Sequence, residues 1–343
     1  AWLEGGAAPA VDAELAFRPM MLANPLDEAA LPAMPREDYA AEVKWDGARI
    51  EAAAGDGGRR VFSRSGDDIG AAFPDLLEAM DWRGCIDGEV LVTRGDEVAP
   101  FSDLQTRLNR KKPTRKLLAD LPAIIMVYDL LHDGEADLRA LPWHARRAAL
   151  EAWMERHNPA RLRLSPVLDG GWDALAARRD AARGAEEEGV MIKRRDAPYL
   201  AGRPAGQWFK WKRAPLTADC VLMYAQRGHG RRSSFYSDFT FGVWADGPDG
   251  PYLAPVGKAY SGFTDAEMAR LDKWVRAHLT ERFGPVRGVT PELVFEVAFD
   301  ALAPSPRRKS GVAMRFPRIA RIRWDKPAAE ADRLDALRAL AGI

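Results

Sequence analysis

The chain has 343 residues, with 50 Lys and Arg residues against 50 Asp and Glu residues, 5 His and 2 Cys. Hydrophobic residues make up 47% and charged residues 29%, which is typical of a globular protein. Cys85 and Cys220 lie far apart and form no CxxC pattern, which argues against a disulfide-stapled scaffold and a cysteine-based zinc site. We find no signal peptide and no apolar stretch long enough to span a bilayer. We therefore expect a cytoplasmic protein, monomeric, with no membrane contact.

The first sixteen residues are rich in Ala, Gly and Pro, and we predict a linker or the remnant of a missing N-terminal region for 1–16. Strand and helix patterns alternate over 17–214, which predicts a mixed α+β domain. Its predicted strands span Ala41–Lys44, Ala48–Ala53, Arg60–Ser63, Cys85–Thr93, Ile124–Leu131, Gly189–Arg194 and Gln207–Trp211. Its predicted helices span Phe73–Met80, Phe101–Asn109, Leu141–Met154 and Trp172–Glu187.

The pattern changes near Pro215, where we place a domain boundary. Several strands with Gly-rich turns and one intervening helix over 215–343 predict a small β-barrel of the oligonucleotide-binding (OB) type. The predicted strands are Cys220–Ala225, Phe235–Ala245, Tyr252–Tyr260 and Leu293–Phe299. The predicted helices are Asp265–His278 and a C-terminal Ala328–Leu340.

The zero net charge conceals three basic segments. Six basic and no acidic residues occur in 107–116, seven basic residues against Asp196 in 193–213, and eight against Asp325 in 307–326. One such run is usually a solvated face. Three runs, two of them mixed with aromatic residues, favour a polyanion as partner or substrate.

The sharpest local signal is Lys44-Trp45-Asp46-Gly47, in which a lysine ends an apolar strand beside an Asp-Gly turn. This placement can present an amine into a cleft, although the same four residues alone also fit a surface hairpin. Further charged and aromatic motifs follow in a fixed order. They are Ser63-Arg64-Ser65-Gly66, a carboxylate turn Asp87-Gly88-Glu89, Tyr128 at the end of a buried strand, Glu188 and Lys193 at the two ends of one short strand, Lys210 and Lys212 on one face of the next, and Arg323-Trp324-Asp325-Lys326.

These motifs together resemble the covalent nucleotidyltransferase superfamily, and within it the bacterial ATP-dependent DNA ligases. The resemblance runs from Phe17 to the C-terminus, and Val256-Gly257-Lys258, Gly262-Phe263-Thr264 and the segment 310–317 extend it through the second domain. It implies an adenylation domain followed by an OB-fold domain, with nicked duplex DNA as the partner. It also implies an enzyme that seals 5′-phosphate/3′-OH nicks through a lysyl-AMP intermediate and a DNA-adenylate.

The resemblance implies a role for each motif residue. Lys44 matches the nucleophile that attacks the α-phosphate of ATP. Because a free lysine is almost entirely protonated at neutral pH, Lys210, Lys212 and a divalent cation are expected to favour its uncharged form. Glu188 matches the carboxylate that holds the metal, expected to be Mg²⁺, with Mn²⁺ as a possible substitute.

The resemblance also implies which residues bind the nucleotide. The set is Tyr128 stacking on adenine, Glu42 beside the adenine edge, Glu89 on the ribose, Arg49, Arg64 and more loosely Arg203 on phosphate, Lys193 in the pocket, and Arg323 and Lys326 on the departing pyrophosphate. Instead of binding the nucleotide, Tyr128 could be a tyrosine of the hydrophobic core, and Arg203 could be a solvated arginine in a loop.

Many members of that family carry an N-terminal helical DNA-binding domain, for which this chain has at most a short stub, so we expect a catalytic core. Two other interpretations stay open. One is a sister enzyme, an RNA ligase or a GTP-using mRNA capping enzyme. The other is a non-catalytic nucleic-acid-binding protein, which would have no need of Lys44, Glu188, Lys210 and Lys212 together.

Overall fold

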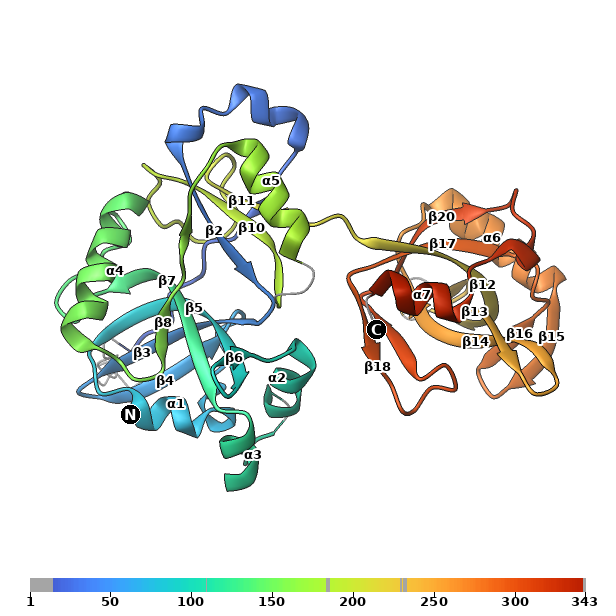
Figure 1. Cartoon of the computed structure of the whole chain (residues 1–343), viewed down its shortest axis with the longest axis horizontal. Coiled ribbons are helices and arrows are strands. Elements are labelled where there is room, and N and C mark those ends of the chain that lie inside the picture. Colours follow the sequence, from blue (N-terminus) through green and yellow to red (C-terminus); the bar gives the residue numbers. More distant parts are fainter. Residues whose placement is uncertain (1–14, 109, 183–185, 229, 231–232, 342–343) are drawn as a thin grey trace, which may run out of the picture. The chain divides into compact units, whose positions relative to one another are not determined.

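The computed structural model describes residues 15–108, 110–182, 186–228, 230 and 233–341 (Figure 1). Contacts divide the chain into two compact units, Ala1–Arg213 and Ala214–Ile343. The predicted linker lies almost entirely outside the described residues. Within them, no helix is both long and apolar enough to cross a membrane. The first unit mixes helices and sheets and the second contains a curled sheet, which confirms the predicted fold class.

Two sheets form the first unit. A five-stranded sheet has the order β1-β11-β10-β2-β9, and a six-stranded sheet has the order β4-β3-β5-β7-β8, with β6 paired to β5. The strands are β1 (Asn24–Pro25), β2 (Tyr39–Trp45), β3 (Ala48–Gly55), β4 (Gly58–Ser63), β5 (Gly84–Arg94), β6 (Glu97–Val98), β7 (Ala123–His132), β8 (Leu162–Leu164), β9 (Val167–Leu168), β10 (Glu187–Arg194) and β11 (Trp208–Lys212).

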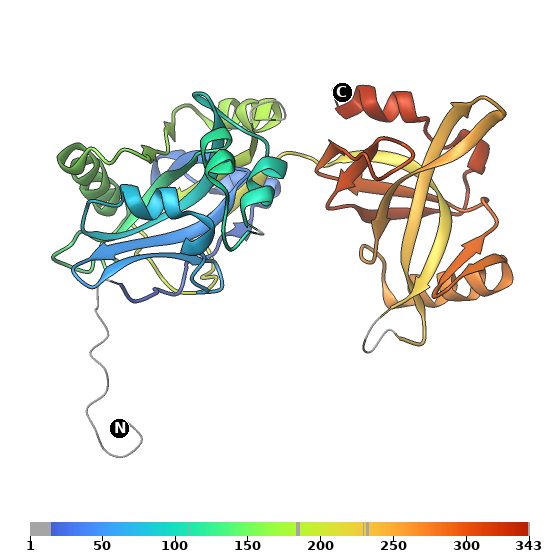
Figure 2. The ribbon, with the colours of Figure 1, turned by 90° about the horizontal axis from the view of Figure 1, so that it is seen from below.

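Helices cover the outer faces of both sheets (Figures 1 and 2). Helix α4 packs on β7 and α5 packs on β10, while α1 and α2 contact the six-stranded sheet. The helices are α1 (Pro74–Ala79), α2 (Phe101–Leu108), α3 (Arg115–Asp120), α4 (Trp143–His157) and α5 (Trp172–Ala181). Buried residues of β3, β5 and β7 contribute much of the main core of this unit. A smaller apolar cluster joins residues of both sheets, among them Ala40, Ala53 and Trp208.

The strands on either side of Asp46-Gly47 do not pair with each other. Strand β2 belongs to the five-stranded sheet and β3 to the six-stranded one, so the chain crosses between sheets instead of forming a hairpin. Gly47 makes the crossing possible, because a Cβ atom there would lie 2.6 Å from the carbonyl oxygen of Val90. This close approach explains the glycine without any need for an unusual backbone angle.

Several predicted boundaries in the first unit were wrong. Asp87-Gly88-Glu89 is not a turn but the middle of β5, and Tyr128 lies within β7, well before its end. The helix predicted over Trp172–Glu187 ends at Ala181, and Glu187 already belongs to β10. Glu187 is buried and pairs with Arg178 of α5, so tertiary contacts outweigh the helical composition of this segment.

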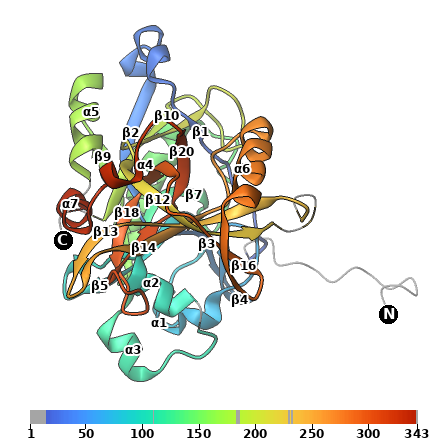
Figure 3. The same cartoon turned by 90° about the vertical axis from the view of Figure 1, so that its right-hand side faces the viewer.

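The second unit is built round one long, bent strand. Strand β12 (Leu216–Arg227) pairs with β13 on one side, and on the other with β17 through its first half and β16 through its second half. Figure 2 shows these strands curving round a common interior, and Figure 3 shows α6 and α7 on different sides of them. The other elements are β13 (Tyr236–Gly247), β14 (Gly250–Ala259), α6 (Asp265–Ala277), β15 (Leu279–Phe283), β16 (Val286–Val289), β17 (Val294–Phe299), β18 (Ala301–Pro304), β19 (Val312–Arg315), β20 (Arg318–Arg323) and α7 (Leu334–Ala341).

The C-terminal helix is shorter than predicted. Ala328–Glu330 forms a single 3₁₀ turn, and α7 begins only at Leu334. Between them, the backbone N–H of Asp332 donates to the carbonyl of Asp219, and the Asp332 carboxylate accepts from the Asp219 N–H. These two bonds tie the segment to β12 in an extended conformation, which interrupts the helix.

The basic segment 107–116 contains one residue with a structural role. Arg107 is fully buried at the end of α2, where its guanidinium donates two hydrogen bonds to Asp75, at 2.5 and 3.0 Å. It also donates to the carbonyls of Ala72 and Leu121, and it lies over the ring of Phe73. Arg107 is therefore an internal anchor, not a surface cation.

We predict that Arg107→Ala lowers the free energy of unfolding of the first unit by about 3–5 kcal/mol, because it leaves the buried Asp75 carboxylate without its partner. Urea unfolding followed by tryptophan fluorescence measures this change. Lys116→Ala, which removes an exposed cation of the same run, is the control and should change stability by less than about 0.5 kcal/mol. Equal effects of the two substitutions would contradict the anchoring role.

Candidate functional site

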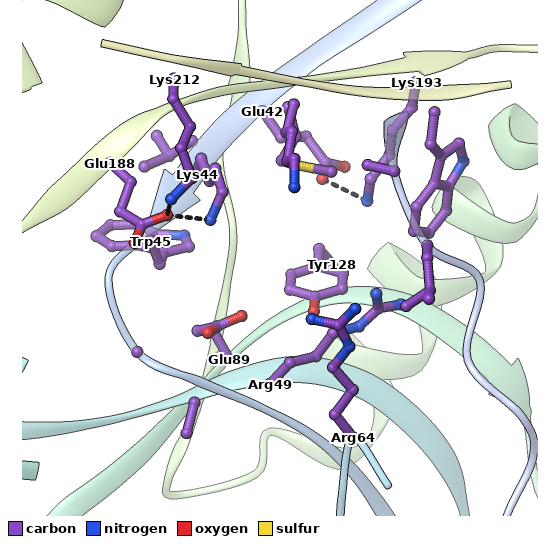
Figure 4. Close-up of a pocket in the computed structure, with 18 of the residues that line it drawn as sticks. Glu42, Lys44, Trp45, Arg49, Arg64, Glu89, Tyr128, Glu188, Lys193 and Lys212 are labelled. Carbon is purple, nitrogen blue, oxygen red and sulfur yellow. Dashed lines mark ion pairs between the residues drawn. The ribbon is translucent and has the colours of Figure 1, made fainter. Parts of the chain in front are cut away.

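A pocket of about 540 Å³ lies in the first unit, between residues of the two sheets (Figure 4). Seven of its lining residues are basic and three are acidic, so the pocket favours an anionic ligand. All the pocket residues predicted from the sequence of the first domain line it: Glu42, Lys44, Arg49, Arg64, Glu89, Tyr128, Glu188, Lys193, Arg203, Lys210 and Lys212.

One wall of the pocket consists of side chains in register across three neighbouring strands. Residues paired directly across a sheet project from the same face, and the face alternates along each strand. Three rows across β2, β10 and β11 therefore share the pocket face. They are Lys44, Gly189 and Lys212; Glu42, Met191 and Lys210; and Ala40, Lys193 and Trp208.

Glu188 reaches this wall through an irregularity in the sheet. The pairing of β10 with β2 shifts register between Glu187 and Gly189, which leaves Glu188 as the extra residue of a bulge. Gly189 has φ +139°, and a Cβ atom there would lie 2.3 Å from the carbonyl oxygen of Trp211. The bulge and the glycine together direct the Glu188 carboxylate toward the two lysines of the first row.

Glu188 pairs with both of those lysines. Its Oε2 lies 2.5 Å from the Nζ of Lys44 and 3.0 Å from the Nζ of Lys212. Burial acts to raise the pKa of Glu188, but the charges of Lys44 and Lys212 hold it below its ordinary value. The carboxylate is therefore ionised at neutral pH, and a metal cation could bind to it.

Glu42 and Lys193 form a buried ion pair deeper in the same wall. Glu42 Oε2 lies 2.6 Å from Lys193 Nζ, and each side chain is 1% exposed. Burial raises the pKa of Glu42, while the charge of Lys193 opposes that rise. Glu42 Oε1 accepts no hydrogen bond from the described residues, and the Arg147 guanidinium lies 3.7 Å from it. Glu42 is also one of the residues that line the pocket.

The opposite wall is held by a second buried carboxylate, Asp87. Arg49 donates to both its oxygens, at 3.0 and 2.6 Å, and Tyr199 donates its hydroxyl to the same group at 2.7 Å. Asp87 is fully buried. The two hydrogen bonds that it accepts from Arg49 fix the plane of the guanidinium. Glu89 pairs directly with Arg49 across β5 and β3, so it shares the pocket face.

Tyr128 lies between the walls in an aromatic and cationic environment. Lys193 Nζ lies 4.5 Å from the centre of its ring, and the Arg49 guanidinium lies 5.8 Å from it. Lys193 Nζ and the Arg49 guanidinium also lie 4.4 and 5.8 Å, respectively, from the centre of the Trp208 ring. The two rings supply flat apolar surface beside fixed positive charge, which suits a planar base that carries phosphates.

Arg64 and Arg203 contribute exposed cations at the pocket rim. Arg64 follows the end of β4, in a turn where the hydroxyl of Ser65 donates to Asp67. Burial, together with the charges of Arg203, Lys212 and Lys44, lowers the pKa of Lys210. Burial and the neighbouring cations therefore both disfavour the charged form of Lys210.

Arg323 and Lys326 lie in the second unit, at the end of β20. Both contact Asp219, and Arg323 also contacts Asp325. Trp208, Tyr199 and Asp87 were not among the predicted site residues. Trp208 could have been recognised because it shares the alternation of Lys210 and Lys212, whereas Tyr199 stands in a loop whose position no periodicity predicts.

The pocket residues suit a magnesium ion only if a bound ligand supplies further oxygen atoms to hold it. Among the residues that the structure describes, no group of three or more His, Cys, Asp or Glu side chains is arranged to hold a metal. Mg²⁺ is commonly held by one or two carboxylates together with substrate phosphates. The ionised Glu188 fits such a shared site.

A family model described as the ATP dependent DNA ligase domain matches residues 20–212, more than half of the chain. The chain belongs to the ATP-dependent DNA ligase family. A second model, for the C-terminal region of ATP-dependent DNA ligases, matches residues 232–326 of this ligase-family chain.

Curated relatives of this ligase-family chain agree with that assignment. It is 36% identical to a probable DNA ligase of Koribacter versatilis (strain Ellin345), over 93% of this chain and 59% of the relative. It is 39% identical to a probable DNA ligase of Anaeromyxobacter dehalogenans (strain 2CP-1), over 94% of this chain and 63% of the relative. The chain thus spans about three fifths of the length of these relatives.

A solved structure supports the fold. It comes from a structure–function study of Lig E DNA ligases that describes DNA binding with a minimal scaffold. Its TM-score to this chain is 0.61 at 18% identity, and the match covers 90% of this chain and all of that one. At this level of identity, the likeness concerns the fold alone.

We predict that Glu89 makes folding stability depend on pH. Burial raises the pKa of Glu89 from 4.5 to about 8, although Lys44 and Arg49 oppose the rise. The folded protein therefore keeps a proton that the unfolded chain has released. The stabilisation is fully present below pH 4.5 and is lost as the pH rises to about 8. Glu89→Gln stays neutral, so the variant should gain stability relative to wild type between pH 5 and 8.

Urea unfolding of both proteins at several pH values checks this. Glu51, whose pKa burial raises to about 7, titrates in both proteins and cancels in the difference. The control is Glu97→Gln, at an exposed position of β6, whose difference from wild type should stay constant. A constant difference for Glu89→Gln as well would show that Glu89 titrates normally.

Proposed function

We propose that this chain is the catalytic core of an ATP-dependent DNA ligase, which seals 5′-phosphate/3′-OH nicks in duplex DNA through a covalent lysyl-AMP. The observation that carries the proposal is the cluster at the crossing between the two sheets. There Lys44, Glu188 and Lys212 meet within 3.0 Å, and Lys210 projects from the same face of the sheet. A protein that only bound nucleic acid would gain nothing from a half-buried lysine paired in this way.

In the first step, the uncharged amine of Lys44 attacks the α-phosphorus of ATP, a P–N bond forms, and the bond to the β-phosphate breaks to release pyrophosphate. The positive charges of Lys210 and Lys212 stabilise the charge that develops on the phosphate. Glu188 would hold Mg²⁺ together with the phosphates of ATP, and Mn²⁺ could serve in the same place. The bound ion would supply further charge neutralisation.

The walls of the pocket suit adenine better than guanine. Tyr128 and Trp208 supply flat surface for a base, and Glu42 lines the pocket together with them. The exocyclic amino group of adenine can donate to a carboxylate, whereas a carboxylate would repel the carbonyl of guanine. This asymmetry supports ATP over GTP as the substrate. Glu89 is assigned to the ribose, and Arg49 and Arg64 to phosphate.

In the later steps, AMP passes from Lys44 to the 5′-phosphate of the nick, and the adjacent 3′-OH then displaces it. Protonation of the departing amine restores Lys44. Arg323 and Lys326 of the second unit are assigned to the pyrophosphate of ATP, and therefore to the first step alone. No base of the DNA is read in this scheme, as the repair of any nick requires.

The substitution Lys44→Ala should abolish AMP transfer to the protein yet permit sealing of DNA that is already adenylylated. Intact-protein mass spectrometry measures the transfer, after pyrophosphate treatment and incubation with Mg²⁺ and either ATP or GTP. We expect one added AMP with ATP only, and none in the variant. Lys116→Ala, at an exposed site in α3, should behave as wild type.

Other outcomes of that experiment separate the alternatives. An adduct with GTP would indicate a capping-type enzyme, and sealing of nicked RNA in preference to DNA would indicate an RNA ligase. A folded, ATP-binding protein that forms no adduct would support a binding protein. An adduct in Lys44→Ala would remove Lys44 from the nucleophile role.

The loop after α2 offers a surface for DNA phosphates. Leu108 lines the pocket, and the exposed Arg110, Lys111 and Lys112 follow it closely in the chain. The double substitution Lys111→Ala/Lys112→Ala should therefore weaken binding to nicked DNA. It should also reduce the slope of log K against log salt by up to about 0.9 for each phosphate that the loop no longer neutralises. Fluorescence anisotropy over a range of salt concentrations measures both quantities.

Self-adenylylation of that variant should be unchanged, because the loop takes no part in the first step. The charge-matched control is Arg83→Ala/Arg156→Ala, which removes two exposed arginines that do not line the pocket. The same change of slope in both double variants would show that the loop has no particular role in binding.

A further inference from the structure

The two basic residues assigned to pyrophosphate lie at the ends of one tight turn. The N–H of Lys326 donates to the carbonyl of Arg323 at 3.3 Å, which closes the turn directly after β20. Trp324, inside the turn, packs on the core of the unit and lies 4.0 Å beneath the guanidinium of Arg270 in α6. The backbone of the turn is thus fastened to the barrel. Its two cations lie close to each other and, without an anion, would repel.

One carboxylate oxygen holds both cations. Asp219 Oδ2 accepts a hydrogen bond from Lys326 Nζ at 2.7 Å and lies 3.4 Å from Arg323 Nη1. The three side chains are between 14% and 20% exposed, so water screens these contacts only partly. Asp325, which also pairs with Arg323, is 70% exposed and touches only that arginine among the turn's cations. Asp219 is therefore the shared partner.

The backbone of Asp219 is fixed from both sides. Across β12 and β17 it pairs with Glu296. On its other side it exchanges two hydrogen bonds with Asp332, each of 2.9 Å. These are the bonds that interrupt the predicted C-terminal helix. A segment with helical composition is therefore held extended, and it fixes one aspartate in place.

We propose that Asp219 is a positioning residue for the first step of ligation. Its carboxylate assembles Arg323 and Lys326 into a single anion-binding pair before ATP arrives. The inference rests on the proposed function, in which that pair engages the pyrophosphate of ATP. It assigns Asp219 no contact with the nucleotide. Loss of its charge lets the two cations separate, so that ATP must bring them together at the expense of its own binding.

The test compares ATP dependence with the later chemistry. Asp219→Asn keeps the shape and an acceptor oxygen but removes the charge, and we expect KM for ATP in self-adenylylation to rise by about tenfold or more. Sealing of pre-adenylylated nicks should stay within about twofold of wild type. In the double variant Asp219→Asn/Lys326→Ala, the loss should not exceed that of Lys326→Ala alone, because Asp219 acts through the pair. Asp219→Glu should restore part of the ATP affinity.

The matched control is Glu296→Gln, which stands opposite Asp219 in the sheet and pairs with Arg321. It should leave KM for ATP unchanged. Equal losses in both assays, or additive losses in the double variant, would identify a merely structural role and overturn the inference. So would an unchanged KM in Asp219→Asn while the wild type forms its adduct normally. If the wild type forms no adduct at all, the proposed function itself fails, and that outcome is visible before any variant is made.

Discussion

The passage of the chain from one sheet to the other at Asp46-Gly47 is the constraint on which the site depends. A strand of seven residues ends, the backbone crosses beside Val90, and a strand of the second sheet begins immediately. Lys44 stands just before the crossing, so its amine faces the space between the sheets instead of solvent. A hairpin at the same sequence would have paired the two strands with each other and left no pocket.

Several charges of the pocket are held in ion pairs, although positive charge is in excess. Glu188 pairs with both Lys44 and Lys212, Glu42 pairs with Lys193, and Asp87 pairs with Arg49. Burying an unpaired charge costs several kcal/mol, so each pair makes the next one tolerable. Removal of Arg49, for example, would leave the buried carboxylate of Asp87 without that cation. A polyphosphate with a divalent cation can meet these groups one by one, which a simple apolar cleft could not.

In the second unit, one carboxylate, that of Asp219, likewise pairs with two cations, Arg323 and Lys326. These two cations repel each other, but in the proposed first step they must stay close enough to bind one ligand. The contact is made by residues about a hundred positions apart in the sequence. The contact depends on β12 and on the segment around Asp332. The Ala and Leu residues of this segment predict a helix, but its hydrogen bonds to Asp219 interrupt that helix.

The sequence by itself determined which residues of the first domain belong to the pocket, and it determined most of the elements. The residues of the first domain that its motifs singled out all line one pocket, and the strand periodicity placed Lys210 and Lys212 on a common face. Local patterns carry this information because alternation along a strand depends on neighbouring residues alone. Only the tertiary structure decided which strands pair, that Asp87 and Tyr199 hold Arg49, that Glu188 sits on a bulge, and that Arg107 is internal. These features come from contacts between distant segments, whose hydrogen bonds and buried charges override local propensity, and no local pattern records them.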